Sequence, residues 1–107
     1  MPKYLFEVDY SAAGSKGLLK EGGSKRLEAL EASVKSVGGK LEAFYFTYGL
    51  RDAITIVDLP DDASAIALSL TVSSSGSVAF KTTPLLSPRE IDRAAKKSVK
   101  YRPPGAK

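Results

Sequence analysis

The chain has 107 residues, which is the size of one domain with a modest hydrophobic core. It contains no cysteine and no histidine, which excludes disulfides, cysteine or histidine ligands for metals, and every catalytic triad that needs either residue. The net charge of +4 belongs to the end of the chain, because residues 1–88 hold 9 Lys/Arg against 10 Asp/Glu and residues 89–107 hold 7 against 2.

No stretch approaches the roughly 20 apolar residues of a membrane-spanning helix. Met1-Pro2-Lys3 leads directly into a strand-like segment, without the apolar core of a signal peptide. We therefore expect a cytoplasmic protein with no membrane partner. The composition also leads us to expect no cofactor and no metal ion.

The first third of the chain predicts a strand, a loop and a helix. Residues 3–10 alternate between two sets of side chains, which is the period of a strand. The glycine-rich residues 11–17 predict a loop, followed by one helical turn at Leu18 and Leu19 that Gly22-Gly23 ends. From Ser24 onward, apolar residues at spacings of 3, 4 and 3 predict a helix that Gly38-Gly39 ends; they are Leu27, Leu30, Val34 and Val37.

Residues 41–48 and 52–59 predict an antiparallel hairpin at the centre of the fold. Both runs are rich in aromatic and β-branched residues, Gly49 suits a three-residue connection, and Pro60 ends the second strand. Alternation along the first strand separates Phe44, Phe46 and Tyr48 from Leu41, Ala43 and Tyr45. Along the second strand it separates Asp52, Ile54, Ile56 and Asp58 from Ala53, Thr55, Val57 and Leu59. Both faces of the hairpin carry apolar side chains, so both need to be covered.

The last third predicts a helix, a strand and a further helix. Asp61 and Asp62 suit the N-terminus of a helix that ends at Gly76, with apolar residues at helical spacing at Ala63, Ile66, Ala67 and Leu70. Residues 77–83 predict a strand that Pro84 ends. Ser87-Pro88-Arg89-Glu90 is a capping box with proline at the first helical position, which predicts a peripheral helix to about Ser98 and a flexible tail after it.

The order strand, helix, strand, strand, helix, strand predicts an α+β fold of the ferredoxin-like βαββαβ type with an extra C-terminal helix. Residues 1–86 form the domain, and residues 87–107 form the C-terminal helix and the basic flexible tail. In this fold both helices cover one face of the sheet. Leaving several aromatic side chains of the other face in water forgoes several kcal/mol, at ~25 cal/mol per Å². The sequence therefore predicts a homodimer with an interface at Phe44, Phe46, Tyr48, Ile54 and Ile56.

Several short segments occur in a characteristic order: Gly38–Leu41 before an aromatic strand, Gly49 and Asp52 around the next turn, Asp58–Asp62 after it, and Ser75–Val78 before a strand with Thr82-Thr83. In these segments, over roughly residues 3–84, the chain resembles the GYD domain family. These are small bacterial proteins named for a Gly-Tyr-Asp signature and grouped with the dimeric α/β-barrel proteins. Arg51 stands at the position of the signature tyrosine. The resemblance implies a dimer of ferredoxin-like units that forms an α/β barrel, and it implies no reaction.

The candidate ligand-binding residues are Tyr10, Tyr45, Tyr48, Arg51 and Asp52. The tyrosines offer hydroxyl groups to an otherwise apolar pocket, and Asp52 is the candidate catalytic base, activated by burial and by Arg51. The alternative is that the tyrosines pack in the core and Asp52 accepts backbone hydrogen bonds. Three further aspartates have oxygens that suit a hard cation, although capping and turn roles explain them more simply: Asp58, Asp61 and Asp62.

Three functions are compatible with this sequence. The leading hypothesis is binding of a small, partly apolar molecule in a pocket walled by the sheet, the helix from Ser24 and residues 14–23. The second is a cofactor-independent enzyme of monooxygenase or isomerase type, which rests on fold analogy and requires Asp52 to be buried beside a pocket. The third is a structural or regulatory dimer without a ligand. Nucleic acid is not an expected partner, because residues 53–57 lack the basic and aromatic residues of an RNA-recognition motif.

Overall fold

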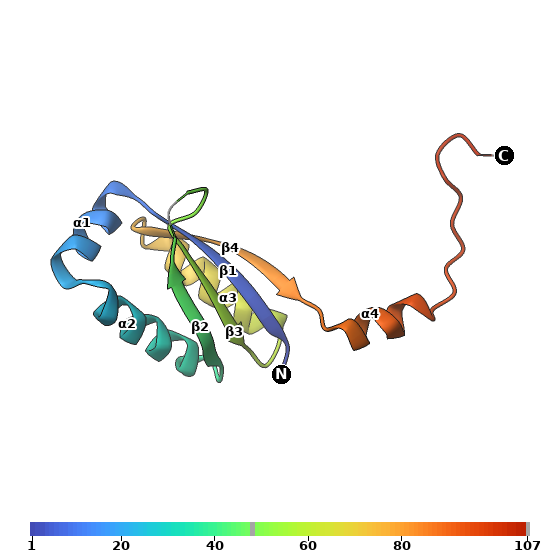
Figure 1. The fold of residues 1–107 in the computed structure, drawn as a ribbon, viewed down its shortest axis with the longest axis horizontal. Coiled ribbons are helices and arrows are strands. Elements are labelled where there is room, and N and C mark those ends of the chain that lie inside the picture. The colour runs from blue at the N-terminus through green and yellow to red at the C-terminus, as the bar shows by residue number, and fades with distance from the viewer. Residues whose placement is uncertain (48, 107) are drawn as a thin grey trace.

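The computed structural model describes residues 1–47 and 49–106, so Tyr48 and Lys107 lie outside the described residues. Its strands are β1 (Lys3–Tyr10), β2 (Lys40–Phe46), β3 (Ala53–Asp58) and β4 (Val78–Leu85). Its helices are α1 (Ala12–Glu21), α2 (Gly23–Ser36), α3 (Asp62–Ser74) and α4 (Pro88–Ala95). All strand pairs are antiparallel and the order in the sheet is β2-β3-β1-β4 (Figure 1). This mixed α+β arrangement is compatible with the predicted ferredoxin-like fold.

The hydrophobic core lies between one face of the sheet and helices α2 and α3. Phe6 is fully buried at its centre and stacks on Phe80 of β4, with ring centroids 4.8 Å apart. Strands β1 and β3, the residue after β3 and both helices contribute the other core residues, which are Tyr4, Val8, Leu30, Val34, Ala53, Val57, Leu59, Ala65 and Leu68. The sheet therefore has one face packed against helices, which we call the helix face, and an opposite face that we call the open face.

Helix α3 packs on the sheet through a different stripe from the one that its spacing suggests. Ala65 and Leu68 are buried in the core, and Asp61 caps the helix by accepting a hydrogen bond from the Ser64 backbone. Ile66 and Leu70 of the predicted stripe are instead 56% and 66% exposed. Apolar residues on both sides of α3 make the spacing ambiguous, whereas the charged residues of α2 mark its outer side.

A β-bulge in β2 changes which side chains share a face. The register of β2 on β3 shifts between Leu41 and Ala43, so Leu41 packs against the core together with Phe44. The alternation predicted from the sequence put these two residues on opposite faces, which is wrong because the extra residue shifts the alternation. The buried Thr55 hydroxyl donates a hydrogen bond to the Ala43 carbonyl at 2.7 Å, and this bond holds the bulged strand in place.

The end of the chain differs from the prediction in two details. Strand β4 does not end at Pro84 but continues to Leu85, because β4 is an edge strand, where a residue without a backbone donor is tolerated. The predicted capping box is confirmed, since the Ser87 hydroxyl accepts from the Glu90 backbone and the Glu90 carboxylate accepts from the Ser87 backbone. Helix α4 ends at Ala95, before the predicted Ser98, and extends away from the sheet beyond the end of β4 (Figure 1).

Candidate functional site

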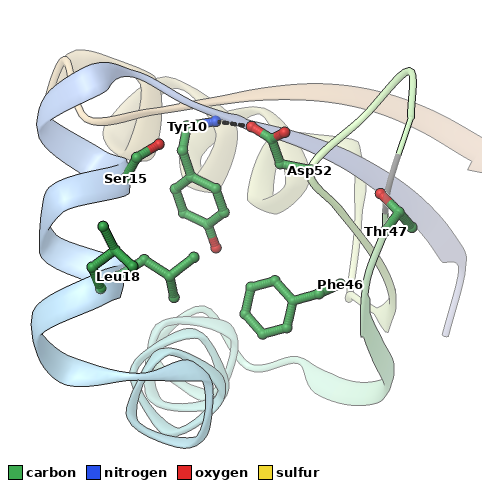
Figure 2. Close-up of a pocket in the computed structure, with 7 residues that line it drawn as sticks. Tyr10, Ser15, Leu18, Phe46, Thr47 and Asp52 are labelled. Atoms are coloured by element: carbon green, nitrogen blue, oxygen red, sulfur yellow. Dashed lines mark hydrogen bonds between the residues drawn. The ribbon is translucent and has the colours of Figure 1, made fainter.

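A partly open pocket of about 640 Å³ lies between helix α1, the end of β1 and the connection between β2 and β3. Its volume is within the range of small-molecule sites. The described residues that line it are Tyr10, Ser15, Leu18, Leu19, Phe46, Thr47 and Asp52. Figure 2 shows Leu18 on one side of the pocket, Phe46 on the other, and the Tyr10 side chain pointing between them.

One wall of this pocket is a helix where the sequence analysis predicted a loop with a single helical turn. Ser11 is the N-cap of helix α1, and its side chain accepts a hydrogen bond from the Gly14 backbone at 3.1 Å. Gly14 faces the start of β4 so closely that a Cβ there would lie 2.0 Å from the Ser77 carbonyl oxygen. Gly14 is therefore required for α1 to pack against Ser77. The glycine content of residues 11–17 predicted a loop, which is wrong because this glycine serves a close contact within a helix. The predicted break at Gly22-Gly23 is confirmed, since Gly22 has a φ of 84° between α1 and α2.

Tyr10, the last residue of β1, separates this pocket from a smaller hollow on its other side. Its ring is half-buried, and burial raises the pKa of its phenol, while the positive charge of Arg26 opposes the increase. Arg26 and Gly14 line the smaller hollow, of about 180 Å³, behind Tyr10. The Tyr10 hydroxyl is thus protonated at neutral pH and can donate or accept a hydrogen bond in the pocket.

Asp52 lies at the rim of the pocket and is held by the backbone of β1. One carboxylate oxygen accepts a hydrogen bond from the Tyr10 backbone at 2.8 Å (Figure 2). The Asp52 backbone donates to the Val8 carbonyl at 3.0 Å. The Asp52 side chain is exposed. The buried Asp52 that a catalytic base requires is therefore not present, and the alternative, a carboxylate that accepts a backbone hydrogen bond, is the arrangement found.

Phe46 and Thr47 form the wall opposite α1. Phe46 packs against the backbone of Gly23, where a Cβ would lie 2.9 Å from the ring. It also meets Phe44 edge to face, with centroids 5.0 Å apart. The Thr47 hydroxyl donates to the Arg51 carbonyl, and the Thr47 backbone donates to the Asp52 carbonyl at 2.9 Å. These bonds fix the start and the end of the connection that carries Asp52.

The other candidate ligand-binding residues do not join Tyr10 and Asp52. The Arg51 guanidinium contacts Glu7 at 3.2 Å and Asp9 at 3.0 Å on the open face, so it does not act on the Asp52 carboxylate. Tyr45 is opposite Ile54 in the sheet and is 66% exposed. Tyr48 lies outside the described residues. The structure therefore brings together two of the five candidates and adds Ser15, Leu18, Leu19, Phe46 and Thr47 to them.

The residues predicted for a dimer interface divide between the two faces of the sheet. Phe44 is opposite Thr55 and Phe46 is opposite Ala53, and directly opposed residues of an antiparallel pair point to the same side. Phe44 and Phe46 therefore lie on the helix face, with the buried Thr55 and Ala53. Ile54 and Ile56 alternate with those residues and lie on the open face. Grouping all four on one surface was wrong, because the sequence does not reveal the register of β2 on β3.

The three aspartates considered for a hard cation each have a role in the fold. Asp58 accepts from Lys3 at 2.8 Å, Asp61 caps α3, and Asp62 accepts from the buried Tyr4 hydroxyl. Within residues 1–47 and 49–106, no group of three or more acidic, cysteine or histidine residues has a geometry that holds a metal ion. In the same part of the chain, no helix is both long and apolar enough to cross a membrane.

Comparison with known proteins identifies the family. The searches of curated proteins and of solved structures found no match. A model of the GYD domain family matches residues 4–95, which extends from the second residue of β1 to the end of helix α4. The matching region exceeds half of the chain and agrees with the resemblance noted in the sequence, and the chain therefore belongs to the GYD domain family.

Proposed function

We propose that this protein binds a small, partly apolar molecule in the pocket between α1 and the β2–β3 connection. The observation that carries the proposal is the composition of the pocket, where Leu18, Leu19 and Phe46 form apolar walls beside the Tyr10 hydroxyl and the Asp52 carboxylate. Apolar walls with a few polar groups that converge on them are typical of small-molecule sites. The exposure of Asp52 disfavours the enzymatic alternative, so binding without a reaction is the function we put forward.

A pocket-filling substitution tests this proposal directly. Ser15→Trp on α1 places an indole in the pocket, whereas Lys16→Trp adds the same group to an exposed neighbour that does not line it. We expect apolar fragments to shift the amide resonances of Leu18, Phe46 and Thr47 in the wild-type chain and in Lys16→Trp, but not in Ser15→Trp. Fragments that shift no resonance of these residues at millimolar concentration would leave only a structural or regulatory role.

We also propose that the functional unit is a homodimer that uses the open face and thereby closes an α/β barrel. The centre of this face is apolar, formed by Leu5, Ala43, Tyr45, Ile54 and Ile56. Ion pairs flank it at both ends, from Arg51 to Glu7 and Asp9 and from Lys3 to Glu42 and Asp58. An apolar centre with a charged rim is the usual composition of a protein interface.

Light scattering measures this assembly. We expect a dimer for the wild-type chain and a monomer for Ile56→Glu, which places a charge at the centre of the open face. Ile66→Glu on the exposed side of α3 is the matched control, and it should leave the dimer intact. A wild-type monomer at all concentrations, or dissociation by Ile66→Glu alone, would contradict this interface.

A further inference from the structure

We infer that the ligand of the pocket is an amphiphile that carries a protonated amine beside an aromatic or branched apolar group. This inference rests on the proposed binding function and specifies the chemical class of its ligand. It comes from the charge at the rim, because Asp52 is the charged residue among the described residues that line the pocket. A carboxylate at the entrance of an apolar pocket attracts cations and repels anions.

Among the described residues, neither of the two arginines next to the pocket forms an ion pair with Asp52. Arg51, its neighbour in the chain, contacts Glu7 and Asp9 on the open face. Arg26 lies behind Tyr10 in the smaller hollow and has Glu21 as an ionic neighbour at 3.9 Å. Arg51 thus pairs with two carboxylates, and Arg26 faces Glu21 and the Tyr10 phenol, so Asp52 is the charged group among the described residues that line the pocket itself.

The geometry of Asp52 leaves room for an ammonium donor. One of its oxygens accepts from the Tyr10 backbone, and this bond fixes the carboxylate at the rim (Figure 2). Within the described part of the chain, its other oxygen accepts no hydrogen bond. An ammonium group can donate to that oxygen in a pocket that is also lined by the Tyr10 and Phe46 rings, and aromatic rings attract cations through their faces.

The remaining lining residues select the rest of the ligand. Leu18, Leu19 and the Phe46 ring offer apolar contact on two sides of the pocket, and the volume of about 640 Å³ exceeds the size of a simple ammonium ion. Ammonium alone would leave these walls in water. An apolar group attached to the amine covers them and gains the free energy of their burial.

Three probes of nearly equal size separate the charge from the apolar contact: phenethylamine, 2-phenylethanol and phenylacetate. Each is titrated into the full chain at pH 7 and followed through the amide resonances of Leu18, Phe46 and Thr47. We expect phenethylamine to bind about fivefold more tightly than the alcohol, which is the scale of an exposed ion pair, and phenylacetate to bind most weakly.

Variants of two aspartates complete the test. Asp52→Asn retains an oxygen for the Tyr10 backbone but removes the charge, so it should lower the affinity for phenethylamine about fivefold and that for 2-phenylethanol by much less. Asp92→Asn on the distant α4 is the control and should change neither affinity. Equal binding of the three probes would overturn the amine class and retain the pocket. Absence of shifts with all three, and with the apolar fragments above, would overturn the proposed function itself.

Discussion

The two faces of the sheet are formed by the same strands but differ in their charged residues. On the helix face, Tyr4, Phe6 and Val8 of β1 are buried against α2 and α3. On the open face, the intervening Leu5, Glu7 and Asp9 are half-buried, and both acidic residues bind Arg51. Apolar content alone does not separate the faces. The positions of the ion pairs distinguish the two faces. These pairs confine the apolar part of the open face to its centre, which is the usual composition of a protein interface.

The largest expected difference between the faces is in stability. Phe6→Ala removes a fully buried ring that stacks on Phe80 and should lower the free energy of unfolding by about 3–5 kcal/mol. Leu5→Ala, one residue away on the open face, should cost less than about 1.5 kcal/mol in the monomer. Urea denaturation at low protein concentration measures both. Equal losses would mean that the open face is already packed within one chain.

The helix face should also determine the alkaline limit of stability. The buried Tyr4 hydroxyl donates to Asp62, which, together with burial, raises the pKa of Tyr4 from 10.0 to about 12. Between these values the unfolded chain loses a proton that the folded chain keeps, so stability is intact below pH 10 and falls as the pH rises towards 12. Tyr4→Phe should flatten this part of the pH profile of unfolding.

On the open face, Lys3 is the residue whose raised pKa can be compared with that of Tyr4. Hydrogen bonds to Asp58 and Glu42 raise the pKa of this exposed lysine, so its contribution is also lost at high pH. Lys3→Met removes that contribution and keeps Tyr4. If Lys3→Met, and not Tyr4→Phe, flattened the profile, the open face would control alkaline unfolding.

The difference between what the sequence predicts and what it does not has a physical basis. The strands, α2 and the capping box of α4 follow from local periodicity and local hydrogen bonds, and these were predicted. Helix α1 was not, because Gly14 disfavours a helix locally but is required by its contact with Ser77, 63 residues further along the chain. The only local signal was Ser11, whose spacing from Gly14 suits an N-cap.

The positions of the site residues also depend on long-range pairing that the sequence does not reveal. Tyr10 and Asp52 were selected from the sequence, and they meet because the pairing of β1 with β3 brings the Tyr10 backbone to the Asp52 carboxylate. Arg51 is adjacent to Asp52 in sequence but turns to the acidic residues of β1. The sequence predicts Phe46 in the interface, whereas it lies on the helix face in the structure. Its face depends on the register of β2 on β3, which long-range pairing sets.

The buried Thr55 hydroxyl gives a second, smaller expected effect on stability from the helix face. Thr55→Val removes the donor to the Ala43 carbonyl at the bulge and should lower the free energy of unfolding by about 1–2 kcal/mol. Thr83→Val makes the same change at an exposed position of the edge strand and should stay within about 0.5 kcal/mol of wild type. Similar losses in the two variants would mean that the bulge does not depend on this hydrogen bond.

The smallest expected effect is that of the ion pairs on the open face. Arg51→Met keeps most of the apolar stem and removes the charge between Glu7 and Asp9. Because the carboxylates are partly exposed, the free energy of unfolding of the monomer should fall by less than about 1 kcal/mol at low salt. In 1 M NaCl, where the Debye length is about 3 Å, the difference from wild type should nearly vanish. A loss that salt does not change would mean that Arg51 acts by packing, and the charged rim of the open face would then be a weaker reason to expect a partner there.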